Sequence, residues 1–163
     1  MNYLGFNKEK ASQTVQSLNR LLANYHVYYQ NLRTFHWKIS GRDFFDLHNK
    51  FEDLYNDARL KIDEIAERIL TLRFEPMSFY SGYLKAADIE EAKDWDDSVD
   101  MVKIILENHS SLIQNIRTAL QRAADAGDEG TVDLLGGFLS SLEKKSWMLD
   151  AWSTKVKEPV TLY

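Results

Sequence analysis

The sequence predicts an all-α protein, a four-helix bundle with one long connection between its second and third main helices. Four long segments repeat apolar residues three and four positions apart, as amphipathic helices do. Only two prolines and seven glycines occur in 163 residues, which favours long uninterrupted helices. The stretch over residues 74–95 is much longer than an ordinary bundle turn, and such a crossover joins two helical hairpins rather than four helices in simple up-and-down order.

The helices are placed by this periodicity and by residues that begin or end helices. Gly41 lies in the break between the first two helices. Asp97 is a suitable N-cap for the third helix, Gly127 is a suitable glycine after its last turn, and Pro159 follows the fourth. The acidic stretch over residues 88–91 can form one or two helical turns within the crossover. The expected helical segments are approximately residues 8–38, 44–72, 97–127 and 131–156.

The composition limits the chemistry that the chain can support. It contains no cysteine, which excludes disulfides, zinc–thiolate sites, iron–sulfur clusters and thiol catalysis. Any metal ion must therefore be held by His, Asp, Glu or backbone oxygen. The length suits a single domain, expected to span residues 1–163.

Hydropathy and charge bear on location and partners. No apolar run approaches the roughly 20 residues needed to cross a bilayer. Residues 1–10 carry no apolar signal segment, so a cytoplasmic location is expected by default. The formal net charge is −5, and the opening residues contribute only Lys8 and Lys10 as basic groups. DNA binding is therefore doubtful, whereas acidity suits a protein that attracts cations.

Four potential metal ligands share one side of the helix expected over residues 44–72. His48 and Glu52 are four residues apart, and so are Asp63 and Glu67. At 100° per residue, the last three fall at about 40°, 60° and 100° from His48, so all four lie on one stripe.

These four residues cannot bind one ion within one chain. Glu52 and Asp63 are separated by roughly 16 Å along the helix axis, whereas metal–ligand bonds are about 2 Å long. They form two half-sites if the helix packs antiparallel against its own copy across a twofold axis, so that His48 and Glu52 of one subunit face Asp63 and Glu67 of the other. Each dimer then holds two equivalent sites. His36, at the end of the first helix, can complete the ligand set.

Two imidazoles and three carboxylates without sulfur suit Fe²⁺, with Zn²⁺ as a possible competitor. The alternative is a solvated helix face on which Asp63 pairs with Arg59 or Arg68. No glutamate is followed by a histidine three residues later, so the Glu-x-x-His motif of di-iron centres inside bundles does not occur. A metal site is therefore expected at an interface rather than in the bundle interior.

The residues around these candidates resemble the signature of the Dps proteins, the mini-ferritins of the ferritin-like superfamily. The similarity extends from the first helix to Trp152. It rests on the following motifs: His36-Trp37, Gly41, Phe44-Phe45, Leu47-His48, Phe51-Glu52, Leu54-Tyr55, residues 62–68 (IDEIAER), Leu142-Glu143-Lys144 and Trp147-Met148-Leu149.

The resemblance implies a ferritin-like bundle and a ferroxidase site shared by two subunits. His36, His48 and Glu52 would ligate iron from one subunit, and Asp63 and Glu67 from its partner. Glu67 would bridge toward a second, weaker iron position. Glu52 departs from the family, in which this position is often Asp: it keeps the charge and the oxygen ligands and adds a methylene.

The resemblance also implies an activity. Dps proteins oxidise Fe²⁺, preferably with hydrogen peroxide, and store ferric mineral inside a dodecameric shell, which protects against oxidative stress. Trp37 would lie beside the site, where it either intercepts oxidising radicals or simply packs. Asp128, Glu129 and Asp133 resemble residues that line an ion-entry pore, although carboxylates at a helix N-terminus also serve as caps.

Two other functions remain open at this stage. Parts of the family compact DNA, usually through a basic tail that this mildly charged N-terminus lacks. The chain could also be a structural helical bundle with vestigial ligands. Iron titration with peroxide separates the last alternative from a ferroxidase.

Overall fold

The computed structural model describes residues 4–5 and 7–154, and within them the chain forms five helices and no strands. The four long helices are those that the apolar periodicity predicts. A fifth, short helix lies in the crossover. The helices are α1 (Lys8–Lys38), α2 (Phe44–Thr71), α3 (Tyr80–Ala86), α4 (Ser98–Ala126) and α5 (Glu129–Ser153).

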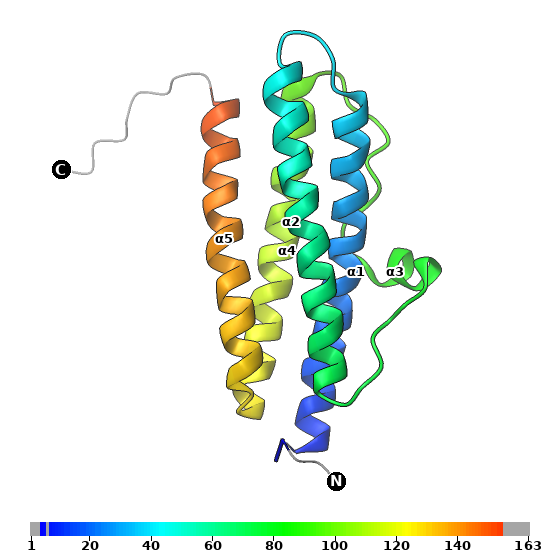
Figure 1. Cartoon of the computed structure of the whole chain (residues 1–163), viewed down its shortest axis with the longest axis vertical. Helices are drawn as coiled ribbons and strands as arrows, with labels where there is room; N and C mark the ends of the chain where they lie inside the picture. The colour runs from blue at the N-terminus through cyan, green and yellow to red at the C-terminus, as the bar shows by residue number, and fades with distance from the viewer. Residues whose placement is uncertain (1–3, 6, 155–163) are drawn as a thin grey trace, which may run out of the picture.

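The long helices form a bundle in which α1 and α2 make one antiparallel hairpin and α4 and α5 make the other (Figure 1). The crossover returns along the length of the bundle, so that α4 runs parallel to α2. Helix α1 packs against α2, α3 and α4, whereas α5 packs mainly against α4. This is the ferritin-like topology, and the all-α prediction with a long crossover is confirmed.

The predicted helix boundaries hold with small shifts. Asp97 caps α4 by accepting from the backbone N–H of Asp100 at 2.9 Å, and Gly127 ends α4 in the left-handed conformation with φ of 68°. Helix α5 begins at Glu129 rather than Thr131, because Asp128 is its N-cap. The expected end of this helix at residue 156 and Pro159 lie outside the described residues.

The predicted position of the short helix in the crossover is wrong. The acidic stretch over residues 88–91 is not helical, and α3 lies before it. Two buried asparagines of α1 explain the difference. Asn24 Oδ1 accepts from the backbone N–H groups of Asp88 and Ile89 at 2.9 and 3.0 Å, so these groups are satisfied without helical partners. Asn31 likewise donates to the Glu90 carbonyl.

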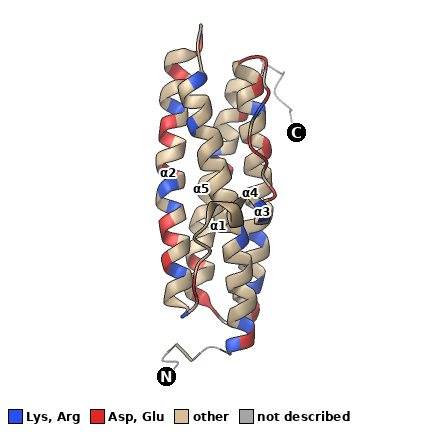
Figure 2. Ribbon diagram, turned by 90° about the vertical axis from the view of Figure 1, so that its right-hand side faces the viewer, with Lys and Arg blue, Asp and Glu red and all other residues tan. Residues whose placement is uncertain are grey.

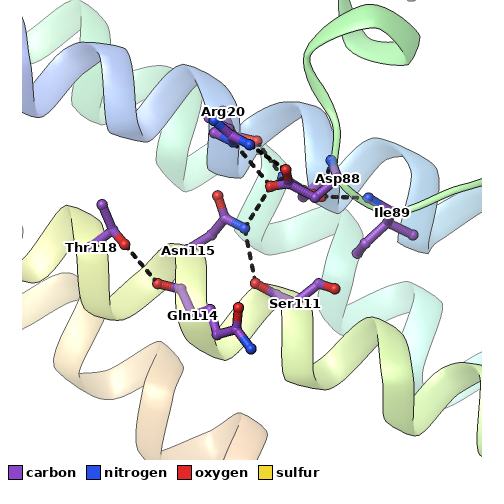
Figure 3. A network of polar contacts seen from close by, with 8 residues as sticks. Arg20, Asp88, Ile89, Ser111, Gln114, Asn115 and Thr118 are labelled. Carbon is purple, nitrogen blue, oxygen red and sulfur yellow. Dashed lines mark hydrogen bonds and ion pairs between the residues drawn. The ribbon is translucent and has the colours of Figure 1, made fainter.

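Asp88 anchors the crossover to two long helices (Figure 3). Its carboxylate accepts hydrogen bonds from the Arg20 guanidinium on α1 and from Asn115 Nδ2 on α4, the latter at 2.9 Å. The Arg20 contact, reinforced by the Asn115 and Asn24 hydrogen bonds, lowers the pKa of the Asp88 carboxyl to about 2. The crossover is therefore held along the bundle by charge as well as by backbone hydrogen bonds.

The surface combines both signs of charge. Lys and Arg are interspersed with Asp and Glu along the visible side of α2 (Figure 2), in keeping with a small net charge. Among the described residues, no helix is long and apolar enough to cross a membrane.

Candidate metal centre

Three of the predicted ligands meet where α1 ends and α2 begins. His36 lies in the last turn of α1, and His48 and Glu52 lie in the first turns of α2. One ligand atom from each side chain lies within 4.8 Å of the other two. The short connection over residues 39–43, with Gly41 in the left-handed conformation, turns the chain back sharply enough to bring the two helix ends together.

The two histidines are held by reciprocal hydrogen bonds to the backbone. His36 Nδ1 lies 2.8 Å from the carbonyl oxygen of His48, and His48 Nδ1 lies 2.9 Å from the carbonyl oxygen of His36. Because a carbonyl only accepts, both Nδ1 atoms carry the proton. In the neutral imidazoles, both Nε2 atoms then have a lone pair available for a metal ion, and their orientation is fixed before the ion arrives.

Aromatic packing restricts the same rings further. The His36 and His48 rings are stacked with centroids 3.8 Å apart, and Phe44 stacks against His48 at 4.7 Å. Phe35, one residue before His36, is fully buried against Phe51 and anchors the end of α1. His36 itself is buried, whereas Glu52 is exposed, so the group opens to the surface on its carboxylate side.

Tyr55 also belongs to this group, although its place in the sequence does not by itself predict a role at the site. Its hydroxyl donates to Glu52 Oε1 at 3.3 Å, and its ring meets the His36 ring edge-on at 5.3 Å. Burial, followed by the nearby Glu52 carboxylate, raises the pKa of the Tyr55 phenol. Its position three residues after Glu52 was the available signal, since such residues share a helix face.

Asp63 and Glu67 are not part of the group of three. Both are exposed, and they lie on α2 eleven and fifteen residues beyond Glu52. The first separation corresponds to roughly 16 Å of helix axis. Within one chain the arrangement is therefore a half-site of two imidazoles and one carboxylate. The carboxylates of Asp63 and Glu67 lie too far along α2 to bind the same ion.

Comparisons with known proteins show the family to which this chain belongs. The ferritin-like domain family matches residues 15–158. A protein of Porphyromonas gingivalis named DNA protection during starvation protein is 42% identical over 151 residues, which cover 93% of this chain and 95% of the relative. The chain belongs to the Dps family of ferritin-like proteins.

Solved Dps structures share the whole fold. The Dps protein of Vibrio cholerae is 45% identical, with a TM-score of 0.91 over 94% of this chain and 97% of that one. Its description places it among ferritin-like diiron-carboxylate proteins. The Dps protein of Bacillus brevis is 35% identical, with a TM-score of 0.87 over 91% of this chain and 99% of that one.

In this Dps chain, Trp37 lies next to the half-site in sequence and is 60% exposed. The Arg33 guanidinium sits over both the Trp37 ring at 4.8 Å and the Tyr29 ring at 5.1 Å. Trp37 therefore has a cation–π partner and is mostly exposed in the single chain. Both the radical-accepting role and simple packing remain predictions.

The three predicted pore residues of this Dps chain differ in their surroundings. Asp128 is buried, and its carboxylate accepts from Arg68 at 2.5 Å and from the backbone N–H of Thr131 at 3.0 Å. A Cβ at Gly130 would lie 2.9 Å from Arg68, so glycine leaves room for this pair. The structure thus supports the capping alternative for Asp128. Glu129 and Asp133 are exposed, and a pore role for them remains a prediction.

Proposed function

We propose that this chain is a ferroxidase and iron-storage subunit that oxidises Fe²⁺ with hydrogen peroxide and deposits ferric mineral in a dodecameric shell. The observation that carries the proposal is the half-site of His36, His48 and Glu52, whose imidazole Nε2 atoms are oriented in advance. Asp63 and Glu67 of a second subunit would complete it. Glu67 would bridge to a weaker second iron position.

The donor set suits the proposed substrate. Two neutral imidazoles and up to three carboxylates match the preference of Fe²⁺ for nitrogen and oxygen ligands, and Zn²⁺ would compete for the same atoms. Carboxylates also stabilise Fe³⁺ as it forms, because they add negative charge beside the more highly charged ion. Overall, two Fe²⁺ and one H₂O₂, with two protons, would become two Fe³⁺ and two waters.

Exposed apolar side chains support a second subunit at this surface. On α2, Leu60 is exposed beside Asp63, and on α3 Leu84 is 56% exposed. Between α1, α2 and α3 lies a cavity of about 380 Å³ whose lining includes Ile62, Tyr83 and Leu84. A monomer seldom leaves such surface uncovered. A twofold partner would bury this surface and would also bring its Asp63 and Glu67 to the half-site of three ligands.

The name of the Porphyromonas gingivalis relative fits the same activity. A protein that consumes Fe²⁺ and H₂O₂ together removes the pair that generates hydroxyl radicals, so DNA can be protected without being bound.

The test is complementation between subunits. His48→Ala and Glu67→Ala should each nearly abolish peroxide-driven Fe²⁺ oxidation, measured by absorbance after anaerobic loading. In a mixed dimer both defects fall in one site and leave the other site intact. With random pairing, refolding the two variants together should restore activity to about a quarter of wild type under twofold symmetry.

The matched control pairs two defects in the same half-site. Co-refolded His48→Ala and Glu52→Ala should not rescue each other, because every site in their mixed dimers lacks one ligand. Light scattering should give a dodecamer of 19.0 kDa subunits for all variants. A stable monomer, or no rescue of His48→Ala by Glu67→Ala despite demonstrated subunit mixing, would contradict the shared site.

A further inference from the structure

A row of hydrogen-bonded side chains crosses the interior of the bundle, away from the half-site. The Tyr28 hydroxyl on α1 lies 2.8 Å from His109 Nε2 on α4, and His109 Nδ1 lies 2.8 Å from Ser146 Oγ on α5. Tyr28 and His109 are 2% and 1% exposed. The proposed iron site uses none of these three residues.

The hydrogen bonds determine which nitrogen of His109 carries the proton. The Ser146 hydroxyl donates to the Leu142 carbonyl at 2.8 Å, so toward His109 its oxygen can only accept. His109 Nδ1 is therefore the N–H donor, and Nε2 presents its lone pair to the Tyr28 hydroxyl, which donates. This is the one arrangement in which all three donors have acceptors. Tyr28 thus has a built-in base.

Burial keeps both members of the pair neutral at rest. Desolvation lowers the pKa of His109 to about 3, and it raises the pKa of Tyr28 well above its ordinary value. Of the charged groups near His109, Asp57 favours the imidazolium, whereas Lys145 and Lys50 oppose it. Transfer of the phenol proton from Tyr28 to His109 is therefore unfavourable while the phenol is reduced. Loss of an electron makes the phenol strongly acidic, and the proton can then transfer.

Tyr25 is a neighbouring buried tyrosine that, unlike Tyr28, has no base hydrogen-bonded to its hydroxyl in the part of the chain that the structure describes. It is 1% exposed and meets the Tyr28 ring edge-on at 6.2 Å. Its hydroxyl, however, has no hydrogen-bond partner among the described residues. Oxidation of Tyr25 would leave a proton with no acceptor among the described residues, and an unpaired charge in a buried position is costly. The two tyrosines thus differ in the one feature that proton-coupled oxidation requires.

We propose that Tyr28 is a redox-active tyrosine that supplies one electron during peroxide reduction while its phenol proton passes to Nε2 of His109. The inference rests on the proposed function for its oxidant. When one Fe²⁺ occupies a site, it gives one electron to H₂O₂; the O–O bond breaks to hydroxide and a hydroxyl-radical equivalent. An electron from Tyr28 reduces that equivalent to a second hydroxide, and solvent protons convert both to water.

The cycle closes with the next ferrous ion. After the first step the pair holds a neutral tyrosyl radical and a His109 imidazolium. A second Fe²⁺ at the site returns an electron to Tyr28, and His109 returns the proton. The sum remains two Fe²⁺, one H₂O₂ and two protons to two Fe³⁺ and two waters. The pair would thus let a singly occupied site avoid releasing a hydroxyl radical.

Aromatic side chains connect the pair to the half-site. Tyr28 and His36 are on the same helix, eight residues or roughly 12 Å of axis apart. Tyr55 contacts His36 at 5.3 Å and Tyr29 at 6.0 Å, and Tyr29 is the chain neighbour of Tyr28. The distance and the intervening rings suit electron transfer without movement of the protein.

The first test uses iron and peroxide. Protein loaded with less than one Fe²⁺ per site is mixed with H₂O₂, frozen rapidly, and examined by electron paramagnetic resonance with natural and ring-deuterated tyrosine. Wild type and Tyr25→Phe should show a tyrosyl signal that narrows on deuteration, and Tyr28→Phe should lose it. A signal that survives Tyr28→Phe, or one insensitive to tyrosine deuteration as a Trp37 radical would be, overturns the proposal.

A second test separates this inference from the proposed function. Iron-free protein is oxidised by azide radicals in pulse radiolysis, which needs no ferroxidase activity. The tryptophanyl absorption should decay into a tyrosyl absorption in wild type and Tyr25→Phe, but not in Tyr28→Phe. If iron oxidation fails while this transfer occurs, the proposed function falls with its peroxide step, and the redox activity of the Tyr28–His109 pair stands. If the transfer is the same in all three proteins, the redox role of Tyr28 falls.

His109→Gln tests the base. Glutamine keeps an oxygen that accepts from the Tyr28 hydroxyl but cannot take its proton, so the variant should fold and still lose the tyrosyl signal. Circular dichroism and the mass of the assembly verify folding. A wild-type signal in His109→Gln would show that the hydrogen bond has only a structural role.

Discussion

At the scale of single residues, Arg68 and Asp128 form the ion pair that connects α2 to the start of α5. Arg68 donates from Nε to Thr131 Oγ1 at 2.8 Å and from Nη2 to Asp128, while Asp128 also caps α5. This ion pair, in which the side chains of Arg68 and Asp128 are 18% and 3% exposed, joins α2 to the start of α5. Removing one partner of such a pair leaves the other charge buried without compensation, which costs far more than a surface ion pair.

Asp128→Ala should therefore lower the free energy of unfolding by about 3 kcal/mol, from the stranded Arg68 charge and the lost cap. Glu129→Ala, one residue along and exposed, is the matched control and should change it by about 0.5 kcal/mol or less. Thermal unfolding at equal protein concentration measures both. If Asp128→Ala slowed iron entry but left stability unchanged, Asp128 would be a pore residue instead of a structural one.

At the scale of elements, the path of the crossover is determined by hydrogen bonds to side chains of the helices that it passes. Asn24 and Asn31 of α1 replace helical hydrogen bonds for the stretch after α3, and Asp88 adds contacts to α1 and α4 (Figure 3). Long connections gain such partners because their backbone groups must be satisfied where they are buried. The same contacts make this element sensitive to acid.

Asp88→Asn should show that sensitivity. The pKa of Asp88 lies at about 2 in the folded chain, below its ordinary value of 3.8. Its contribution to stability is therefore complete above about pH 4 and is lost as the pH falls toward 2. Allowing for solvent screening, we expect Asp88→Asn to cost about 1 kcal/mol at neutral pH and almost nothing near pH 2.

Thermal unfolding of wild type and Asp88→Asn across this pH range, at one protein concentration, measures the difference. Asp94→Asn, an exposed carboxylate of the same connection, should follow wild type throughout. A difference between wild type and Asp88→Asn that stays constant from neutral pH down to pH 2 would contradict an electrostatic anchor.

At the scale of the whole molecule, the charge balance disfavours direct binding to DNA, although the proposed consumption of Fe²⁺ and H₂O₂ can still protect DNA. Strong binding to a phosphate backbone requires clustered Lys and Arg that displace counterions. Here the net charge is −5, and along α2 basic residues are interspersed among acidic ones (Figure 2). An assembly of such subunits presents no dominant positive field to a duplex.

The assembled protein should therefore not retard duplex DNA at about 0.15 M salt without added divalent cations. It should still protect DNA from strand breaks when Fe²⁺ and H₂O₂ are added together. His48→Ala, which should assemble but not oxidise iron, is the control and should protect poorly. Clear retardation of DNA by wild type at this salt concentration would mean that direct binding contributes.

The sequence by itself determined the four long helices, their caps at Asp97 and Gly127, and the stripe that carries His48, Glu52, Asp63 and Glu67. These follow from local causes: apolar period, capping chemistry and helical spacing. The proximity of His36 and His48 could also be predicted from the sequence, because a short turn between antiparallel helices brings their adjoining ends together.

Only the tertiary structure decided the rest. The position of α3, the burial of Asp128 against Arg68 and the row from Tyr28 through His109 to Ser146 each join residues at least 37 positions apart in sequence. Spacing along one helix says nothing about such contacts, because they depend on which faces of different helices meet. His109 illustrates the limit: its place on an apolar stripe predicts burial, but only the packing of α1, α4 and α5 reveals that Tyr28 and Ser146 determine its tautomer.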